Sequence, residues 1–278
     1  MSPILITALA ILSALLLLFL LYLLVLVRPG AKSPADPALL CDYAHRGLHG
    51  ERVPENSLRA FELACGQGRG IELDVQLSRD GVVMVFHDYT LKRMTGVDKR
   101  LRELTAAELQ GLPLKGTDQT IPTFAEVLAL VDGRVPLLVE LKGENLNTTL
   151  CKAVAEHLSA YRGAFCIESF NPLLVRGMKK CLPEVYGGLL YTNVCRDKKK
   201  YSLLNMAVSG MLLNCLARPN FIAYNQLDRN SLPVKLAAGL YRAPRFVWTV
   251  RSDEDYQRAH DLGEYPIFEN LTQYKEIT

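Results

Sequence analysis

Two acidic residues inside an apolar stretch are the first candidates for chemistry. Residues 71–75 read Ile-Glu-Leu-Asp-Val, and successive side chains of a β-strand point to opposite faces of the sheet. Glu72 and Asp74 are therefore expected on one face and the three apolar side chains on the other. Two neighbouring carboxylates on a half-buried strand repel each other and are costly to desolvate. A bound cation would offset that cost.

A histidine follows the two acids at a spacing typical of a hairpin. Asp80-Gly81 separates two strand-like runs, 71–77 and 82–88, and this dipeptide is a strong signal for a β-hairpin. A two-residue turn there lies midway between Asp74 and His87. We therefore expect His87 directly across from Asp74, on the same face of the hairpin.

A third carboxylate lies in another strand-like run, 137–142, which reads Leu-Leu-Val-Glu-Leu-Lys. Its polar face carries Glu140 and Lys142. Three carboxylates without cysteines or clustered imidazoles around them favour a hard divalent ion, Mg²⁺ or Ca²⁺. A salt-bridge network, for example between Glu140 and Lys142, is the alternative interpretation.

The sequence His45-Arg46-Gly47 follows the first strand-like run. With His87 it places two imidazoles beside the expected cation site, which favours acid–base catalysis over a structural role. Arg46 could offer a planar pair of donors to a phosphate or form a surface ion pair. Gly47 fits either a close ligand approach or a simple turn. Trp248, the single tryptophan, could line the pocket or pack in the core.

The elements that position these residues alternate between strands and helices, which predicts a parallel sheet. Eight strands are expected, beginning near residues 43, 71, 136, 164, 186, 221, 246 and 266. A helix follows each of the first seven; those after the fifth and sixth strands are expected at 199–216 and 231–240. This count predicts a (β/α)₈ TIM barrel over 41–278, with active-site residues at the carboxyl ends of the strands. The run 82–88 is expected to fold back over that end, and 89–122 to form a mostly polar insertion.

The N-terminal segment predicts a membrane anchor. Residues 4–27 contain no charge, which is long enough to span a bilayer and too long for an ordinary signal peptide, although a cleaved signal is the alternative. Residues 28–40 contain three prolines and indicate a short, stiff linker. Arg28 and Lys32 after the span predict a cytoplasmic barrel, and seven scattered cysteines agree with a reducing compartment. The net charge of +3 with interleaved signs suggests no nucleic-acid partner, and the sequence predicts no oligomeric state.

The chemistry-bearing motifs also occur in a recognisable order. In chain order they are His45-Arg46-Gly47, Pro54-Glu55-Asn56-Ser57, Glu72-Leu73-Asp74-Val75, Asp80-Gly81, His87-Asp88, Ile121-Pro122-Thr123, Glu140-Leu141-Lys142, Ser169-Phe170 and Trp248-Thr249-Val250. This order resembles the glycerophosphodiester phosphodiesterase family over nearly all of 43–270. Two segments differ: Arg251 stands where the family usually has Asn, and Phe268-Glu269-Asn270-Leu271 replaces the usual Thr-Asp-x-Pro.

The resemblance implies a TIM barrel with a small insertion after His87-Asp88, and hydrolysis of glycerophosphodiesters to glycerol 3-phosphate and an alcohol. It implies His45 and His87 as the acid–base pair and Glu72, Asp74 and Glu140 as ligands of the divalent metal. Arg46 and Lys142 would contact the phosphate, and Trp248 could line the pocket beside them. Two alternatives stay open. One is a lysophospholipase D or phosphoinositide phospholipase acting on membrane lipids, and the other is an inactive, membrane-tethered binding protein.

Overall fold

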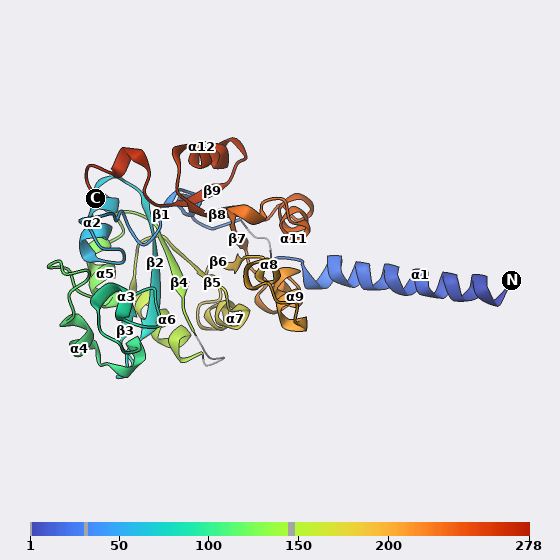
Figure 1. Cartoon of the computed structure of the whole chain (residues 1–278), viewed down its shortest axis with the longest axis horizontal. Coiled ribbons are helices and arrows are strands. Elements are labelled where there is room, and N and C mark those ends of the chain that lie inside the picture. The colour runs from blue at the N-terminus through green and yellow to red at the C-terminus, as the bar shows by residue number, and fades with distance from the viewer. Residues whose placement is uncertain (1, 31–32, 144–147) are drawn as a thin grey trace.

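The computed structural model describes residues 2–30, 33–143 and 148–278, and divides the chain into a long helix and a barrel (Figure 1). Helix α1 (Pro3–Leu21) projects away from the barrel, and a π-helical turn (Tyr22–Leu26) continues it. None of its residues is buried. An 18-residue window within residues 3–26 has a mean hydropathy of 3.0, so by length and composition this helix could span a membrane.

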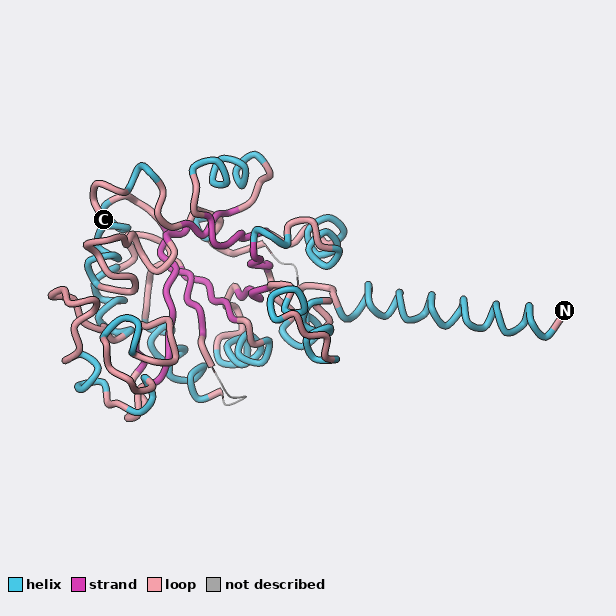
Figure 2. The backbone as a smooth tube through the Cα atoms, viewed as in Figure 1, coloured by secondary structure: helices cyan, strands magenta, loops and turns pink. Residues whose placement is uncertain are grey.

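Eight parallel strands close into the expected TIM barrel. The strands are β1 (Tyr43–Ala44), β2 (Gly70–Leu77), β4 (Leu137–Leu141), β5 (Phe165–Ser169), β6 (Gly187–Tyr191), β7 (Phe221–Asn225), β8 (Arg245–Val250) and β9 (Tyr265–Phe268). Each pairs with the next in this order, and β1 pairs with both β2 and β9, which closes the sheet. Figure 2 shows the strands around the centre, with helices outside them. The predicted fold class is confirmed.

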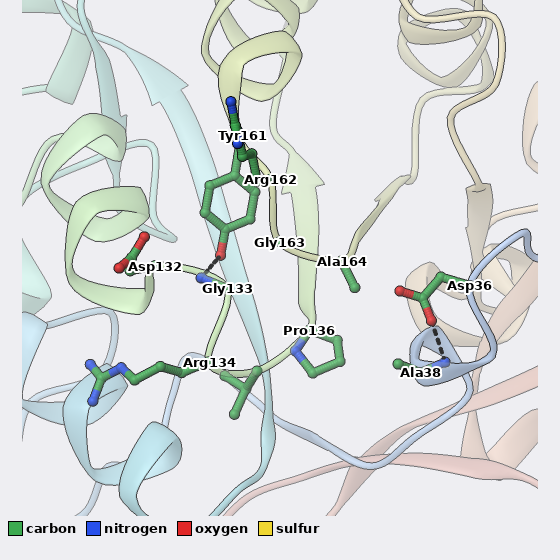
Figure 3. Close-up of a pocket in the computed structure, with 11 residues that line it drawn as sticks. Asp36, Ala38, Asp132, Gly133, Arg134, Pro136, Tyr161, Arg162, Gly163 and Ala164 are labelled. Atoms are coloured by element: carbon green, nitrogen blue, oxygen red, sulfur yellow. Dashed lines mark hydrogen bonds between the residues drawn. The ribbon is translucent and has the colours of Figure 1, made fainter.

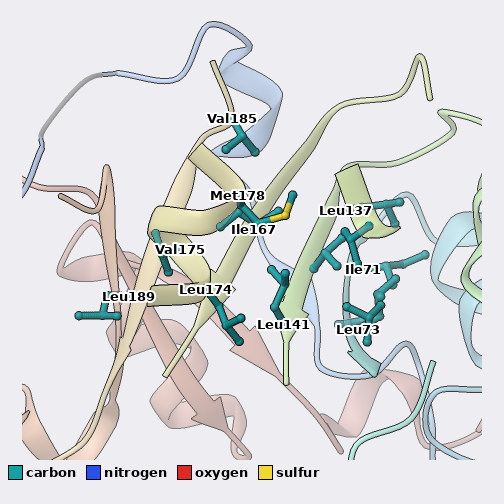
Figure 4. Close-up of a cluster of buried hydrophobic side chains, with 14 of the residues drawn as sticks. Ile71, Leu73, Leu137, Leu141, Ile167, Leu174, Val175, Met178, Val185 and Leu189 are labelled. Atoms are coloured by element: carbon teal, nitrogen blue, oxygen red, sulfur yellow. The ribbon is translucent and has the colours of Figure 1, made fainter. Parts of the chain in front are cut away.

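The helices bury the apolar faces of the strands. The outer ring includes α2 (Leu58–Gly66), α5 (Phe124–Val131), α6 (Thr149–Ala160), α7 (Pro172–Cys181) and α12 (Asp253–Asp261). Ile71 and Leu73 of β2 lie in one buried cluster with Leu174 and Val175 of α7, as Figure 4 shows. Alternate residues of β2 therefore pack outward, which leaves Glu72 and Asp74 to face the barrel interior, as the alternation predicted.

One expected helix is broken. The single helix predicted over 199–216 is wrong: the segment after β6 forms α8 (Val194–Lys198), α9 (Leu203–Ser209) and α10 (Asn214–Ala217). Ser202 caps the start of α9 with its side chain, and Lys199 ends α8 in the left-handed conformation. The helix predicted over 231–240 does form, as α11 (Leu232–Lys235) continued directly by a π-helical turn (Leu236–Leu240).

The hairpin forms, but its predicted register is wrong by one residue. Strand β3 (Val83–Val85) runs antiparallel to β2, with Gln76 opposite Met84. The turn has three residues, 79–81, because Gly81 adopts φ 83° and the Asp80 carboxylate accepts hydrogen bonds from Ser78 Oγ and the Ala106 N–H. The backbone carbonyl of Asp74 therefore accepts the N–H of Phe86, and His87 comes one residue later.

The insertion over 89–122 has a small hydrophobic core of its own, despite its polar sequence. It contains α3 (Lys92–Thr95), α4 (Ala106–Gln110) and a 3₁₀ turn (Leu101–Glu103). Its buried cluster consists of Met84, Phe86, Leu91, Met94, Leu101, Leu104, Ala106, Leu109, Leu114 and Ile121. Met84 and Phe86 belong to the hairpin arm, so the insertion packs directly on the arm that precedes His87.

The base of α1 is attached to the barrel. Val27 is fully buried in the main core, and its carbonyl accepts a hydrogen bond from Asn214 Nδ2 (2.8 Å). The Tyr241 hydroxyl donates to the Leu23 carbonyl, and the Gly30 N–H donates to the Pro219 carbonyl (2.7 Å). Part of the segment predicted as a linker, 28–40, thus lies against the barrel; Ala31 and Lys32 lie outside the described residues.

Candidate active site

A pocket of about 240 Å³ opens at the carboxyl ends of the strands, where the sequence placed the chemistry. Its lining includes His45, Arg46, Glu72, His87 and Glu140. These residues come from the ends of β1, β2 and β4 and from the segment that follows β3. The strand order brings them together, because parallel strands end at the same rim of a barrel.

The three predicted metal ligands converge. Glu72, Asp74 and Glu140 each offer a carboxylate oxygen, and these oxygens all lie within 4.8 Å of one another. All three side chains are buried, and Asp74 lies opposite Glu140 in the register of β2 and β4. Buried, closely spaced carboxylates are the oxygen donors that Mg²⁺ and Ca²⁺ accept. The donor set therefore fits a hard divalent cation.

The pKa values of these acids show the cost of that arrangement. Burial, with repulsion from Asp74 and Glu140, raises the pKa of Glu72 well above its usual range. Burial raises the pKa of Glu140 to about 7. Burial alone would also raise the pKa of Asp74, but the cationic Lys142 outweighs it and holds that pKa below the ordinary value. The charge is thus concentrated on Asp74, between two carboxyls that resist ionisation.

Two basic residues partly offset this charge. Lys142 Nζ lies 2.8 Å from Glu140 Oε1 and 3.1 Å from Asp74 Oδ1. The Arg46 backbone N–H donates to Glu72 Oε2 (2.9 Å), and its guanidinium Nε lies 3.5 Å from Asp74 Oδ2. Arg46 lines the pocket, whereas the Lys142 ammonium is held between the two acids.

His45 is held by a carboxylate that the sequence did not single out. Its Nδ1 donates to Glu269 Oε2 at 2.5 Å, and its Nε2 lies 4.0 Å from Glu72 Oε2. Glu269 also contacts His49 Nε2 (3.6 Å) and accepts from Arg251 Nε (2.7 Å). Because a carboxylate accepts the Nδ1 proton, Nε2 of neutral His45 is left as the acceptor facing the pocket. Burial lowers the pKa of His45 to about 4.

His87 is held by a second chain of charges. Its Nδ1 donates to Asp88 Oδ1 (2.7 Å), and Arg93 Nε donates to Asp88 Oδ2 (2.6 Å). Arg93 also forms a two-pronged pair with Glu55, which accepts from Arg46 as well. This chain links the insertion to the pocket. Although the strand register differs from the prediction, His87 does reach the same pocket as Glu72 and Glu140.

The arm bends at His87 because one side chain gathers three carbonyls. Gln76 Nε2 donates to the carbonyls of Phe86, His87 and Asp88, at 2.8 Å, 3.2 Å and 2.9 Å. Strand pairing ends at Val85, so the alternation of faces no longer applies to His87. The bend therefore compensates for the one-residue shift in register.

Gly47 serves packing. A Cβ at this position would lie 2.9 Å from Ala60 of α2, and the residue has φ 79°. Glycine is therefore required here because the backbone passes close to helix α2, and the close approach that the sequence suggested is to this helix of the barrel.

Aromatic side chains line the remaining wall. Trp248 and Phe170 meet edge to face with ring centroids 5.6 Å apart, and Trp248 Nε1 donates to the Ala223 carbonyl (3.0 Å). Phe170 is 47% exposed. Both line the pocket, which is one of the two positions that the sequence left open for Trp248. The pocket is also lined by Glu168, a buried carboxyl from β5 that pairs in register with Glu140.

Comparisons with known proteins agree with this geometry. The sequence model described as the glycerophosphoryl diester phosphodiesterase family matches residues 45–272. The chain belongs to this family. It is 35% identical over 161 residues to a glycerophosphodiester phosphodiesterase of Caldanaerobacter subterraneus subsp. tengcongensis; the match covers 53% of this chain and 65% of that protein, just under two thirds. It is 32% identical to lysophospholipase D GDPD1 of Homo sapiens, with 79% of this chain and 80% of that protein covered.

A solved structure extends the likeness to three dimensions. A phosphodiesterase of Oleispira antarctica, in complex with the product sn-glycerol-3-phosphate, superposes with a TM-score of 0.69 at 25% identity. The superposition covers 82% of this chain and 92% of that one. The family and the barrel predicted from the sequence are therefore confirmed.

Several polar residues of this family member's pocket were missed or left without a role. Glu269 was noted only as a departure from the family pattern, Glu55 only as part of a motif, and Glu168 and Arg93 not at all. The signal for Glu168 was its position two residues before the end of a strand-like run, in the place that Glu140 holds in its own run. No local signal marks Glu269 as the partner of His45, because they are 224 residues apart.

A larger hollow lies elsewhere on the barrel. It has a volume of about 420 Å³ and lies at the amino ends of β4 and β5, lined by Asp36, Asp132, Arg134 and Arg162 among others (Figure 3). In Figure 3 the Tyr161 hydroxyl accepts the Gly133 N–H, and the charged side chains point in different directions. Convergent chemistry is therefore found at the smaller pocket.

Proposed function

We propose that this chain hydrolyses glycerophosphodiesters to glycerol 3-phosphate and an alcohol, with a divalent cation bound by Glu72, Asp74 and Glu140. The observation that carries the proposal is that His45, His87, Glu72 and Glu140 line one pocket, with an Asp74 carboxylate oxygen within 4.8 Å of those of Glu72 and Glu140. A metal-binding carboxylate cluster flanked by two imidazoles is suited to phosphoryl chemistry, because a phosphodiester needs charge neutralisation and two proton transfers.

The bound cation would neutralise the non-bridging phosphate oxygens and acidify the attacking hydroxyl. The donors of this chain fit such an ion: all three are hard carboxylate oxygens, and their mutual repulsion is a cost that a cation relieves. We propose Mg²⁺ or Ca²⁺, since both prefer this donor type. The two ions differ in the size and rigidity of coordination that they require.

The two histidines would move the protons. His45, with Nδ1 bonded to Glu269, presents Nε2 to the pocket and is equipped to accept or return a proton there. His87, with Nδ1 bonded to Asp88, presents Nε2 in the same way. One imidazole takes the proton of the nucleophile, which is water or a glycerol hydroxyl, and the other protonates the leaving alkoxide. Each such transfer contributes about 10²–10⁴-fold.

The basic residues would bind the phosphate. The Arg46 side chain lines the pocket and is pre-oriented by Glu55, which holds NH1 at 2.8 Å. Lys142 lies behind the acids, and its contact with both Asp74 and Glu140 supports a role in holding these ligands in addition to any contact with substrate. Trp248 and Phe170 offer an apolar wall to the glycerol or to the alcohol.

The N-terminal helix supports a membrane-anchored enzyme. We propose that α1 is an uncleaved, single-pass anchor and that the barrel lies on the cytoplasmic side, where Arg28 follows the span. The burial of Val27 supports retention of the helix, because cleavage near its end would remove a side chain that packs in the main core.

A lysophospholipase D activity is the second candidate. It is favoured by the likeness to lysophospholipase D GDPD1 of Homo sapiens together with an apolar helix that could place the pocket beside lipid. In this case the leaving alcohol belongs to the headgroup, and the glycerol phosphate product keeps an acyl chain.

A substrate panel tests both candidates. The full-length protein is assayed with glycerophosphocholine, glycerophosphoglycerol and lysophosphatidylcholine, each with Mg²⁺, Ca²⁺ or a chelator. Release of glycerol 3-phosphate that stops in chelator and in His87→Ala supports the first proposal. Exclusive release of lysophosphatidic acid supports the second. Metal-independent turnover would contradict the carboxylate site, and full activity of correctly folded His87→Ala would contradict the histidine mechanism.

A further inference from the structure

Helix α9 exposes large apolar side chains without a protein partner to cover them in the described part of the chain. Leu203 is 89% exposed, Leu204 67% and Met206 54%, and no residue of α9 is buried. Tyr201, just before the helix, is 80% exposed. Scattered apolar residues on a surface are normal, but four within six positions form a contiguous patch that calls for a partner. We name Tyr201, Leu203, Leu204 and Met206 the α9 patch.

The α9 patch lies beside the base of α1. Figure 1 shows α1 leaving the barrel next to α9. Helix α9 ends at Ser209, whose carbonyl accepts the Tyr191 hydroxyl (2.8 Å). Five residues further on, Asn214 bonds the Val27 carbonyl. The segment that carries the patch is therefore fixed both to the end of β6 and to the base of the anchor.

The length of α1 is about the thickness of the hydrocarbon core of a bilayer, so a helix that spans the membrane would hold the barrel directly at its surface. The 19 residues of α1 span about 28 Å at 1.5 Å per residue. The hydrocarbon core of a bilayer is about 30 Å thick. Contacts with the barrel begin immediately afterwards, at Tyr22 and Leu23. If α1 spans the membrane, its whole free length is needed for the crossing, and the barrel surface around its base must meet the lipid headgroups.

The chemistry of the patch suits that boundary. Leucine, methionine and tyrosine side chains enter the region between headgroups and acyl chains, and lysines at the edge of such a surface attract anionic lipid. Lys198, Lys199 and Lys200 precede the patch and are all exposed. Apolar and basic residues thus occur together, next to the helix that would bring the membrane to them.

We propose that the α9 patch inserts into the surface of the bilayer that holds α1, with Lys198–Lys200 against its headgroups. This proposal rests on the proposed anchor. The patch follows β6, whose residue Leu190 lines the catalytic pocket, and the carbonyl of Ser209 at the end of α9 accepts the hydroxyl of Tyr191, the last residue of that strand. Insertion would hold the pocket at the height of the headgroups and favour substrates whose phosphodiester belongs to a membrane lipid.

Fluorescence quenching by bromine-labelled acyl chains tests the insertion directly. The full-length chain is reconstituted in vesicles of phosphatidylcholine and phosphatidylglycerol, as Leu204→Trp and as the matched variant Leu262→Trp. Leu262 is also exposed, at 41%, but follows α12 at the amino end of β9. We expect brominated lipid to quench the emission that Leu204→Trp adds to the parent, and to leave that of Leu262→Trp unchanged. Equal quenching of both, or of neither, overturns the proposal.

A second variant tests the consequence for substrate. In Leu203→Glu/Leu204→Glu we expect turnover of vesicle-borne lysophospholipid to fall by about tenfold, since two leucines leave the apolar phase. Turnover of soluble glycerophosphocholine should be unchanged, as it should in the control Leu262→Glu. An equal fall with both substrates, or no fall with either, overturns the proposal.

Two measurements on the unmodified chain separate this proposal from the ones it rests on. Soluble turnover reports the proposed reaction, and flotation with vesicles in alkaline carbonate reports the anchor. Loss of either result removes the proposed function or the anchor, and the patch proposal falls with the anchor. If both hold and Leu204→Trp is not quenched, the insertion alone is wrong. Concentration-dependent self-association in detergent that shields the introduced indole from brominated lipid would assign the patch to a second copy of this chain instead.

Discussion

Glu269 Oε2 lies 2.5 Å from His45 Nδ1, so the last strand of the barrel orients a catalytic candidate on the first. The two residues are adjacent only because β9 pairs with β1 and closes the sheet. Glu269 also accepts from Arg251, which is 60% exposed at the rim. The Glu269 carboxylate therefore connects the exposed Arg251 at the rim to the His45 imidazole, so a charge bound at the rim can alter the environment of His45.

Removal of Glu269 should impair turnover more than binding. In Glu269→Ala, His45 loses the partner that selects its tautomer and ring orientation, and we expect kcat to fall by about 10²-fold or more, with a small change in KM. Glu269→Gln, whose amide oxygen can still accept the Nδ1 proton, is the matched control and should retain more activity. Steady-state kinetics on a soluble glycerophosphodiester decides this. Equal kcat for Glu269→Ala and the parent would exclude the positioning role.

The decrease of kcat/KM on the acid side of the pH profile should occur at low pH, near the pKa of His45. Burial, which outweighs the hydrogen bond that His45 donates to Glu269, lowers the pKa of His45 to about 4. The imidazole is then neutral above that pH and can accept a proton. We expect this group to leave kcat/KM level from pH 7 to about 5 and to reduce it toward pH 4.

The free energy of unfolding should also decrease as the pH falls. The unfolded chain protonates His45 near its ordinary pKa of about 6.5. Between that value and the folded pKa, the unfolded state holds more protons, so the contribution of His45 to the free energy of unfolding is lost as the pH falls from 6.5 to 4. Urea unfolding of the parent and of His45→Gln over this range measures the difference. A loss of kcat/KM centred near pH 6.5 and traced to His45 would contradict its environment.

Glu72→Gln should have opposite effects with and without metal. Burial and the neighbouring acids raise the pKa of Glu72, so its ionised form destabilises the fold at neutral pH. Neutralising it in chelator should increase the free energy of unfolding, because the fold then no longer holds a carboxyl whose ionisation is opposed by burial and by Asp74 and Glu140. In Mg²⁺ or Ca²⁺ the same change should weaken binding at least about tenfold.

Calorimetric titration and thermal unfolding in chelator measure the two effects. The matched control is Glu62→Gln. Glu62 is an exposed carboxylate on α2 that pairs with Arg134, so this variant removes one charge away from the pocket. Gln76→Glu cannot serve as the control, because Gln76 holds the arm that carries His87. A Glu72→Gln variant that binds metal like the parent would refute the ligand assignment.

Phe86→Ala should damage catalysis through the insertion. Phe86 is buried in the small core of the insertion and precedes His87 directly. Truncation should cost about 3–5 kcal/mol of stability and loosen the arm, with a loss of kcat. Leu109→Ala, in the same core but far along the chain from His87, is the matched comparison. If both variants lose the same stability yet Phe86→Ala loses no more activity, the insertion does not position His87.

The sequence predicted what is local. Strand alternation correctly separated the outward Ile71 and Leu73 from the inward Glu72 and Asp74. The hairpin register failed because Asp80 binds the Ala106 N–H, a contact from the insertion that changes the turn from two residues to three. His87 nevertheless reaches the pocket because Gln76 bends the arm.

What the sequence could not predict depends on barrel closure. Glu269 and His45 become neighbours only when the last strand meets the first, and Glu55 and Arg93 meet only when the insertion folds onto the rim. Glu168 could have been predicted, because in the register of the parallel strands it lies beside Glu140. A rule that every inward polar residue near a strand end belongs to the site would have found it.

The division of β3 between two cores bears on protein engineering. Val83 and Val85 pack in the main core, whereas Met84 packs in the core of the insertion. A graft that exchanges residues 89–122 for the corresponding loop of a relative would leave Met84 and Phe86 facing foreign side chains. Chimeras should therefore be cut before β3, at the turn over 79–81, so that the donor loop arrives with its own arm and its own histidine.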